Sequence, residues 1–133
     1  MRIIVDTNVL MSAILFGGTP ARILQAWREA TVGLVMSPEI IDEYVRVAER
    51  LSARYPGVEV QRILALIVQN AEVVHGSPLP GPVCEDPDDD KFLACAVAAN
   101  VEVIVSGDKK LRAVSGYAGI RVVTPRQFAD ESI

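Results

Sequence analysis

Acidic side chains are concentrated in one short stretch of the chain. Five carboxylates fall within the six residues 85–90, directly before an apolar pattern with helical spacing. Asp86 followed by Pro87 is typical of an N-cap and a first helical residue, because the Asp oxygen accepts a free backbone N–H and proline needs no acceptor. Asp90 falls where the turn begins to face the core, and a carboxylate there needs a cation or hydrogen bonds. The stretch alone fits both a capping cluster and a metal site.

Three more acids stand at positions related to predicted strands. Asp6 and Asp108 come directly after the strand-like runs 2–5 and 103–105, Asp90 opens the helix that leads to the second run, and Glu43 lies near the start of a helix that follows residues 33–36. In open α/β sheets the functional crevice lies outside the carboxyl ends of the strands. We therefore expect these acids at one edge of the sheet, although a lone Glu on a helix margin is more often solvated.

Four carboxylates in one pocket repel one another unless cations compensate them. Mg²⁺ or Mn²⁺, as one or two ions, is the expected partner, because hard divalent ions take oxygen ligands. Such a site suits hydrolysis of phosphodiester bonds. The predicted catalytic and metal-binding residues are Asp6, Glu43, Asp90 and Asp108.

Other polar residues near these positions have predicted supporting roles. Hydroxyl and amide groups beside the acids are expected to orient them, namely Thr7, Asn8 and Ser106. Neighbouring carboxylates are candidate auxiliary metal ligands, namely Asp88 and Asp89. Basic residues close in sequence are candidates for holding phosphates, although for each a solvated surface charge is the commoner role, namely Arg22, Lys91, Lys109, Lys110 and Arg112.

Strands and helices are predicted to alternate along the whole chain. Apolar and β-branched runs predict strands at 2–5, 33–36, 72–74, 101–105 and 120–123. Helical spacing and N-cap signals predict helices from Val9, from Thr19-Pro20, over 38–53, over 58–71, after Asp86-Pro87, over 109–112 and after Thr124-Pro125, with Trp27 and Val45 among the buried residues. This order predicts an α/β fold with a parallel sheet covered by helices on both faces.

Length and composition narrow the class of protein. With 133 residues and no linker or repeat, the chain is predicted to be one domain over 1–133. A net charge of -4 argues against binding nucleic acid by bulk attraction, although metal ions reverse the sign locally. Cys84 and Cys95 lack CxxC spacing and a secretory signal, so inert thiols in a cytoplasmic, non-membrane protein are expected. His75, the only histidine, has no partner for a metal site.

The motifs together resemble the acidic quartet of the PIN-domain nucleases. They are Asp6-Thr7-Asn8 after the first strand, Glu43 after Ser37-Pro38, Asp90 in Asp-Asp-Lys-Phe-Leu-Ala-Cys-Ala, and Asp108 in Val-Ser-Gly-Asp-Lys-Lys-Leu. The similarity covers nearly the whole chain and points to the bacterial toxins of toxin–antitoxin pairs related to the VapC type. It implies a three-layer α/β/α sandwich with a central, mostly parallel sheet, and a metal-dependent endoribonuclease. It also implies a homodimer inhibited by a small antitoxin. Lys110 stands where relatives of this branch commonly have a second acid.

Two other classes of function compete with a nuclease. A PIN-like domain without catalysis would bind RNA or a protein partner and keep the same fold. An acidic phosphotransfer domain is disfavoured, because a phosphatase with an Asp nucleophile needs Asp-x-Asp after the first strand and Asn8 takes the second place. A receiver domain needs two adjacent acids there and a further phosphoacceptor Asp after a middle strand, and neither is apparent.

Overall fold

Five parallel strands form one central sheet in this computed structural model, which describes all 133 residues. The strands are β1 (Arg2–Val5), β2 (Gly33–Met36), β3 (Glu72–Val73), β4 (Val103–Val105) and β5 (Arg121–Val123), and their order across the sheet is β3-β2-β1-β4-β5. Ile4 pairs with Ile104 and Val5 with Val105, so β1 lies beside a strand about a hundred residues further along the chain. The predicted α/β class is confirmed, and every strand pair is parallel.

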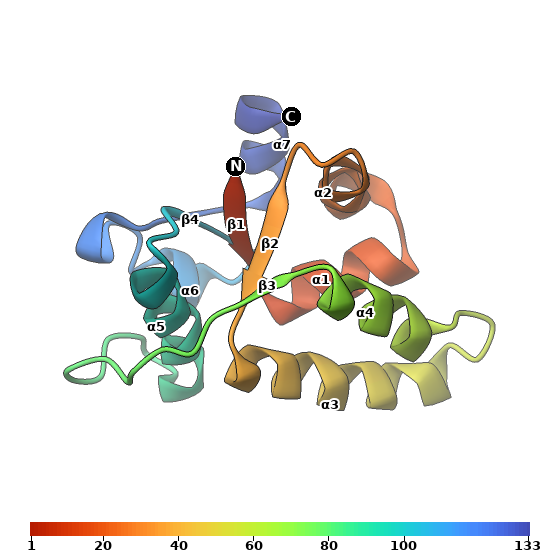
Figure 1. The fold of residues 1–133 in the computed structure, drawn as a ribbon, viewed down its shortest axis with the longest axis horizontal. Helices are drawn as coiled ribbons and strands as arrows, with labels where there is room; N and C mark the ends of the chain where they lie inside the picture. The colour runs from red at the N-terminus through yellow and green to blue at the C-terminus, as the bar shows by residue number, and fades with distance from the viewer.

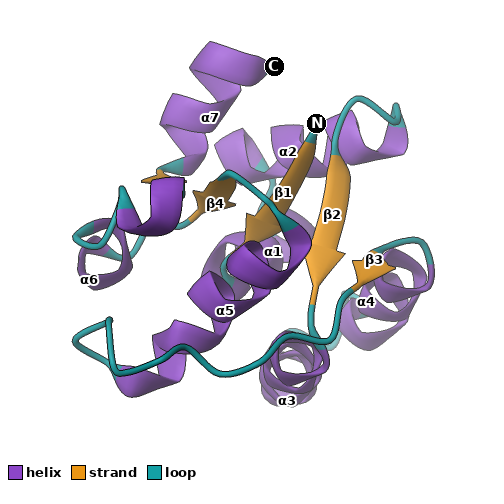
Figure 2. Ribbon diagram, turned by 60° about the vertical axis from the view of Figure 1, so that its left-hand side comes forward, coloured by secondary structure: helices purple, strands orange, loops and turns teal.

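Seven α-helices cover the two faces of this sheet, as the three-layer prediction requires. They are α1 (Thr7–Leu15), α2 (Gly18–Arg28), α3 (Pro38–Arg54), α4 (Val60–Gln69), α5 (Asp90–Ala99), α6 (Lys109–Arg112) and α7 (Pro125–Ser132). Figure 1 shows α5 and α6 on one side of the strands and α1, α2 and α4 on the other, and α7 packs on α2. In Figure 2, α3 lies beyond the carboxyl end of β2.

The direction in which the strand order grows reverses between β1 and β4. From β1 the chain adds β2 and then β3 on one side, and afterwards it adds β4 and β5 on the other side. Such a switch point leaves a crevice outside the carboxyl ends of the two strands that flank it, because their connections leave in opposite directions. The fold therefore provides a crevice where β1 and β4 end.

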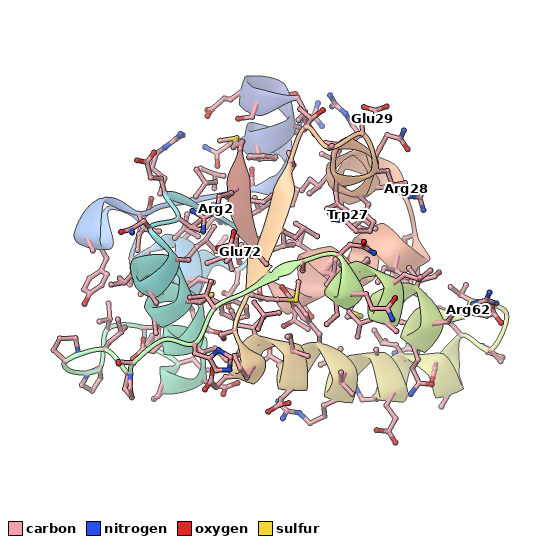
Figure 3. All side chains as sticks on the ribbon, in the orientation of Figure 1. Arg2, Trp27, Arg28, Glu29, Arg62 and Glu72 are labelled. Carbon is pink, nitrogen blue, oxygen red and sulfur yellow. The ribbon has the colours of Figure 1, made fainter.

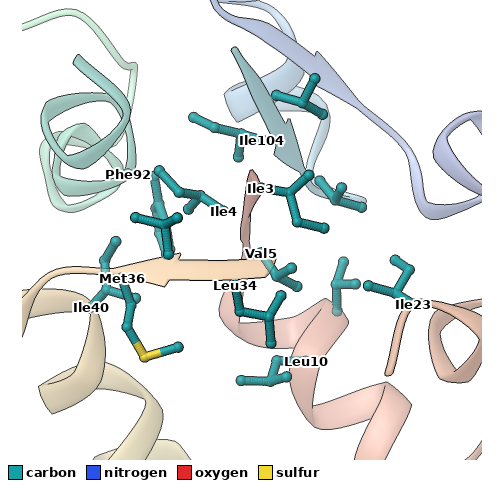
Figure 4. Close-up of a cluster of buried hydrophobic side chains, with 14 of the residues drawn as sticks. Ile3, Ile4, Val5, Leu10, Ile23, Leu34, Met36, Ile40, Phe92 and Ile104 are labelled. Carbon is teal, nitrogen blue, oxygen red and sulfur yellow. The ribbon is translucent and has the colours of Figure 1, made fainter. Parts of the chain in front are cut away.

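The core is built from β-branched strand residues and the helix faces packed on them. Ile3, Ile4 and Ile104 are completely buried in the middle of the sheet, and Phe92 of α5 packs on one face while Leu10 of α1 packs on the other (Figure 4). Burial of side chains of this kind stabilises by about 1.5–3 kcal/mol each. The interior therefore holds the strand ends rigidly in place.

Some element limits differ from the sequence prediction. The strand expected over 101–105 begins at Val103, and the helix expected to restart at Thr19 begins at Gly18, because Gly17 precedes it with φ 76. Asp86 does cap a helical segment, accepting the N–H of Asp88 at 3.0 Å, but that segment is a 3₁₀ turn, η1 (Pro87–Asp89), and α5 follows it.

Two side chains expected in the core are less buried than predicted. Val45 of α3 is 48 % exposed, because it lines an apolar hollow between α3 and α4 and does not reach the sheet. Trp27 of α2 is half-buried and packs against the margin of the core (Figure 3). Arg2 of β1 donates two hydrogen bonds to Glu72 of β3, at 2.9 and 2.6 Å, and hydrogen bonding to Arg2 is the main cause of the lowered pKa of Glu72 (Figure 3).

The two cysteines are free and buried. Burial raises the pKa of the Cys84 thiol to about 12 and that of Cys95 to about 11. Both thiols are therefore protonated at neutral pH, and a protonated thiol is a poor nucleophile.

No helix alone has the length and apolar character to cross a membrane; α1 and α2, which are bent by 90° to each other, pass that test only as a pair.

Candidate functional site

The carboxyl ends of β1 and β4 carry two acids that one serine connects. Ser106, completely buried just after β4, donates its hydroxyl to Asp6 Oδ2 at 2.6 Å, and its oxygen accepts the backbone N–H of Asp108 at 3.0 Å. The N–H of Asp6 also donates to the carbonyl of Val105 at 2.9 Å, which continues the β1–β4 ladder to its end. The sheet itself thus fixes Asp6 relative to Asp108.

Asp6 is held as a buried carboxylate among other acids. Burial raises its pKa above the ordinary value, the hydrogen bond from Ser106 and the backbone of Thr7 act in the opposite direction, and repulsion from Glu43 and Asp108 adds to the increase. The pKa stays raised overall because these favourable contacts do not offset burial and repulsion. A nearby cation would remove this penalty.

A hollow of about 500 Å³ opens beside these two acids. It is lined by Asp6 and Asp108 together with Asn8, Ser12 and Gly107, so backbone and polar groups surround the carboxylates. Asn8 is exposed, and its amide faces solvent next to the acids. This is the crevice predicted at the switch point.

Glu43 reaches the same edge of the sheet from α3. Ser37 caps that helix by accepting the N–H of Ile40 at 3.3 Å, and the Tyr44 hydroxyl donates to the carbonyl of Val5 at the end of β1. One Glu43 oxygen, Oε2, accepts a hydrogen bond from the Thr7 hydroxyl. The other oxygen is bound by a lysine, so both oxygens of this carboxylate have partners.

That lysine is Lys91 of α5. Its Nζ lies 2.6 Å from Glu43 Oε1 and 3.0 Å from Asp88 Oδ2, and both the Lys91 and the Glu43 side chains are only 14 % exposed. Burial lowers the pKa of Lys91, but hydrogen bonds to the two acids outweigh burial and the pKa is raised overall. Lys91 is therefore charged, and it ties α5 to α3.

Asp90, predicted as a catalytic and metal-binding acid, has a different environment from the one expected. Its Oδ1 accepts the N–H of Cys84 at 2.7 Å, and its Oδ2 accepts the N–H of Val83 at 3.2 Å. Burial raises the pKa of Asp90, but these backbone hydrogen bonds exceed that effect and the pKa is lowered. The carboxylate holds the end of the proline-rich loop against α5, which is a structural contact.

Asp89 is the residue of the acidic run 85–90 whose pKa is raised in part by the acids at the strand ends. Burial raises its pKa to about 6, and repulsion from Asp6, Asp86, Asp108 and Glu43 contributes to this increase. Unlike Asp90, it accepts no hydrogen bond from a backbone or side-chain donor. Asp89 is the last residue of η1, and Asp90 begins α5, so the two neighbouring acids lie in different elements and have different environments.

The predicted basic residues are distributed unevenly around this edge. Lys110 is exposed and lies 3.6 Å from Glu85, and its backbone N–H donates to Asp108 Oδ1 at 2.9 Å. Lys109 is exposed, whereas Arg112 is half-buried and its Nε is buried without a hydrogen-bond partner. Arg22 lines another hollow with Gln25 and Glu29, apart from the acids. Of the five predicted basic residues, Lys91 alone contacts a predicted catalytic acid through its side chain.

The donor atoms at this edge match a hard divalent ion in kind. Carboxylates from several elements face this edge, and burial, with a smaller contribution from repulsion between the acids, raises the pKa values of Asp6 and Asp89. No three His, Cys, Asp or Glu side chains are close enough together to share one ion, and Glu43 is already bound by Lys91. The residues therefore fit a cation chemically, provided that side chains shift to surround it.

The sequence alone also matches a known family. A family model described as PIN domain matches residues 2–110. The chain belongs to the PIN domain family. The match covers β1 through α6 and so includes every acid described above, while no curated protein matches the chain.

Solved structures share this PIN domain fold. VapBC-1 from nontypeable Haemophilus influenzae aligns with a TM-score of 0.59 at 15 % identity, over 95 % of this chain and 99 % of that chain. VapBC2 from Rickettsia felis, bound to a DNA fragment from their promoter, aligns with a TM-score of 0.54 at 13 % identity, over 92 % and 97 %. A domain of a functionally unknown protein from Methanocaldococcus jannaschii gives 0.51 at 14 %, over 92 % and 89 %.

Proposed function

We propose that this PIN domain protein is an endoribonuclease that depends on Mg²⁺ or Mn²⁺ and hydrolyses phosphodiester bonds of RNA. The observation that carries the proposal is the shared crevice of Asp6 and Asp108 at the switch point. Glu43 is close enough to contribute to the raised pKa of Asp6, and Asp6 and Asp108 contribute to the raised pKa of Asp89. Carboxylates placed so close together repel one another, and this repulsion lowers the stability of a protein that binds no cation there.

We assign the ion to Asp6, Asp89 and Asp108, with Glu43 as a fourth ligand. Asp89 replaces Asp90 in this set, because Asp90 is committed to the backbone of the loop at residues 83 and 84. Bound there, one or two divalent ions would supply positive charge that attracts a phosphodiester and lowers the pKa of water. Asp88 stays a candidate auxiliary ligand, although it pairs with Lys91.

The protein's own residues then orient the acids and the substrate. Ser106 and Thr7 donate to Asp6 and Glu43 and so fix the directions in which these carboxylates point. Asn8 and Ser12, which line the crevice, are placed to donate hydrogen bonds to phosphate or ribose. Lys109 and Lys110, both exposed beside Asp108, are the cations best placed to hold the flanking phosphates, and Arg112 follows them on α6.

We further propose that the protein is the toxin of a toxin–antitoxin pair, acts in the cytoplasm and forms a homodimer. This proposal is supported by the resemblance of its motifs to VapC-type toxins and by two structural relatives that were solved as VapBC complexes. The partner expected on this basis is a small antitoxin protein that inserts into the acidic groove. Co-expression with a candidate antitoxin that abolishes cleavage would test this assignment.

The test of the nuclease is cleavage of a mixed RNA pool by purified protein with Mn²⁺ or Mg²⁺. Activity should vanish with EDTA and in the Asp6→Asn variant, and it should persist in Asp130→Asn, which removes one exposed acid on α7. Cleavage that survives both EDTA and Asp6→Asn would refute the proposal.

A PIN domain without catalysis, which binds RNA or a protein partner, is the second candidate. The ion pair between Lys91 and Glu43 favours it, because one acid of the quartet already has a cation from the protein. In this case RNA would bind with equal affinity in EDTA and in Mg²⁺, and no fragments would form. A gel-shift titration beside the cleavage assay distinguishes the two functions.

A further inference from the structure

The ion pair between Lys91 and Glu43 has a geometry that bears on metal binding. The Thr7 hydroxyl donates to one Glu43 oxygen, and the Lys91 ammonium binds the other oxygen. Asp88 also binds the ammonium of Lys91. Both members of the pair are 14 % exposed, so water weakens this pair less than it weakens a surface pair. Glu43 is therefore neutralised by a cation that belongs to the chain.

A divalent ion that uses all four acids needs the Glu43 oxygen that Lys91 occupies. Lys91 lies on the one Glu43 oxygen that Thr7 does not contact, and an ammonium beside an incoming divalent ion repels it. We propose that Lys91 is an internal counter-ion that competes with the divalent ion for Glu43 and so weakens metal binding. This inference rests on the proposed metal site.

The structure also provides a place for the displaced ammonium. Lys91 lines a second hollow, of about 430 Å³, between the proline-rich loop and the start of α3. Asp88 already lies 3.0 Å from the ammonium, and Glu39 and Ser37 lie on the wall of this hollow, so Lys91 has acceptor oxygens near it other than those of Glu43. Metal entry thus exchanges one ion pair for another and leaves no buried charge unpaired.

The experiment measures Mn²⁺ affinity by calorimetry for the metal alone, without RNA. The Lys91→Met variant should bind Mn²⁺ about three- to tenfold more tightly than the natural protein, since it lacks the competing cation. Lys91→Arg, which retains the charge, should stay within about twofold of the natural affinity. Lys109→Met is the matched control: it removes a lysine from the same edge that has no contact with Glu43, and it should change affinity far less.

A double-variant cycle distinguishes competition for Glu43 from a general effect of charge. In the Glu43→Gln background the substitution Lys91→Met should give a much smaller gain, because the contested carboxylate is gone and only the repulsion between the ammonium and the ion is removed. An undiminished gain in that background, an equal gain in Lys109→Met, or unchanged affinity in Lys91→Met would each overturn the proposal. RNA cleavage that continues in that last case would leave the nuclease assignment intact, so the two failures are distinguishable.

NMR of the lysine side chains in the natural protein tests the proposal without any variant, so it does not depend on whether a variant folds. The chain contains only three lysines, at 91, 109 and 110, so their side-chain ¹⁵N resonances are few enough to assign. On titration with diamagnetic Mg²⁺ the Lys91 Nζ resonance should move in proportion to metal occupancy, while the resonances of Lys109 and Lys110 shift less. An unmoved Lys91 resonance in the metal-saturated protein would overturn the proposal.

Discussion

Ser106 donates its hydroxyl to Asp6 at 2.6 Å across the junction of β1 and β4, from a position that solvent does not reach. The same oxygen accepts the N–H of Asp108, so one small side chain sets the relative position of two acids. Residues that fix the direction of a ligand typically affect metal affinity or activity by about 10- to 100-fold when they are changed.

Ser106→Ala should therefore lower the rate of RNA cleavage by about tenfold and weaken Mn²⁺ binding. It should also lower the free energy of unfolding by about 1–3 kcal/mol, because Asp6 loses a donor while it stays buried. Steady-state cleavage and urea unfolding would check both effects. Ser52→Ala, on the exposed side of α3, is the control, and an equal loss of activity there would contradict this role for Ser106.

Asp6→Asn should abolish cleavage and leave the metal-free protein at least as stable as the natural one. The substitution keeps the shape of the side chain and removes a buried charge that Glu43 and Asp108 repel. We expect the free energy of unfolding, measured by thermal denaturation in EDTA, to rise by about 1 kcal/mol. A variant that is inactive and also markedly less stable would show that loss of folding, and not loss of an acid, explains the inactivity.

Substitutions of Asp89 and Asp90 should have different effects, because we expect Asp89 to bind the metal ion and Asp90 to stabilise the fold. Asp89→Asn should lose cleavage and Mn²⁺ affinity and keep or gain stability in EDTA. Asp90→Ala should lose about 1–3 kcal/mol of stability, because two backbone N–H groups at 83 and 84 lose their acceptor, and should keep measurable Mn²⁺ affinity. Calorimetric titration with Mn²⁺ and thermal unfolding would distinguish them. The reverse pattern would restore Asp90 to the metal-binding set.

Metal-free protein should be more stable in mild acid than at neutral pH. The pKa of Asp89 is about 6 in the folded state and near 3.8 in the unfolded chain, so the folded state takes up a proton first as the pH falls. The unfolding free energy should therefore rise by about 1 kcal/mol between about pH 7.5 and pH 5, after allowance for solvent screening. Asp6, whose pKa is also raised, adds to this trend.

Urea unfolding in EDTA across this range would measure the pH effect, and Asp89→Asn should flatten it. Groups with a lowered pKa, such as Asp88 and Glu72, lose their contribution only at more acidic pH, so they do not mask the trend. Saturating Mn²⁺ should reverse the slope, because protons then compete with a bound cation. A natural protein that loses stability steadily from neutral pH downward would contradict the clustering of these acids.

The strands, and the acids that follow them, were readable from the sequence because both signals are local. Asp6 and Asp108 stand directly after short β-branched runs, and parallel strands bring their carboxyl ends to one edge. The hydrogen bonds of Asp90 to the backbone at residues 83 and 84 could not be predicted, because they depend on how the proline-rich loop folds back onto α5. Lys91 was a candidate for holding phosphates or a solvated surface charge, and its partner Glu43 could not be predicted because that residue is 48 positions away in the sequence.

The pairing of Ile4 with Ile104 also determines when the acids can meet. β1 is made first, but its neighbour β4 comes only after about three quarters of the chain, and contacts between residues so distant in sequence form late because loop closure must precede them. A nascent or truncated chain that lacks β4 has Asp6 and Glu43 but no Asp108 and no Ser106 to hold the cluster. A product that stops before β4 should therefore lack the proposed nuclease activity, even though it already contains Asp6 and Glu43.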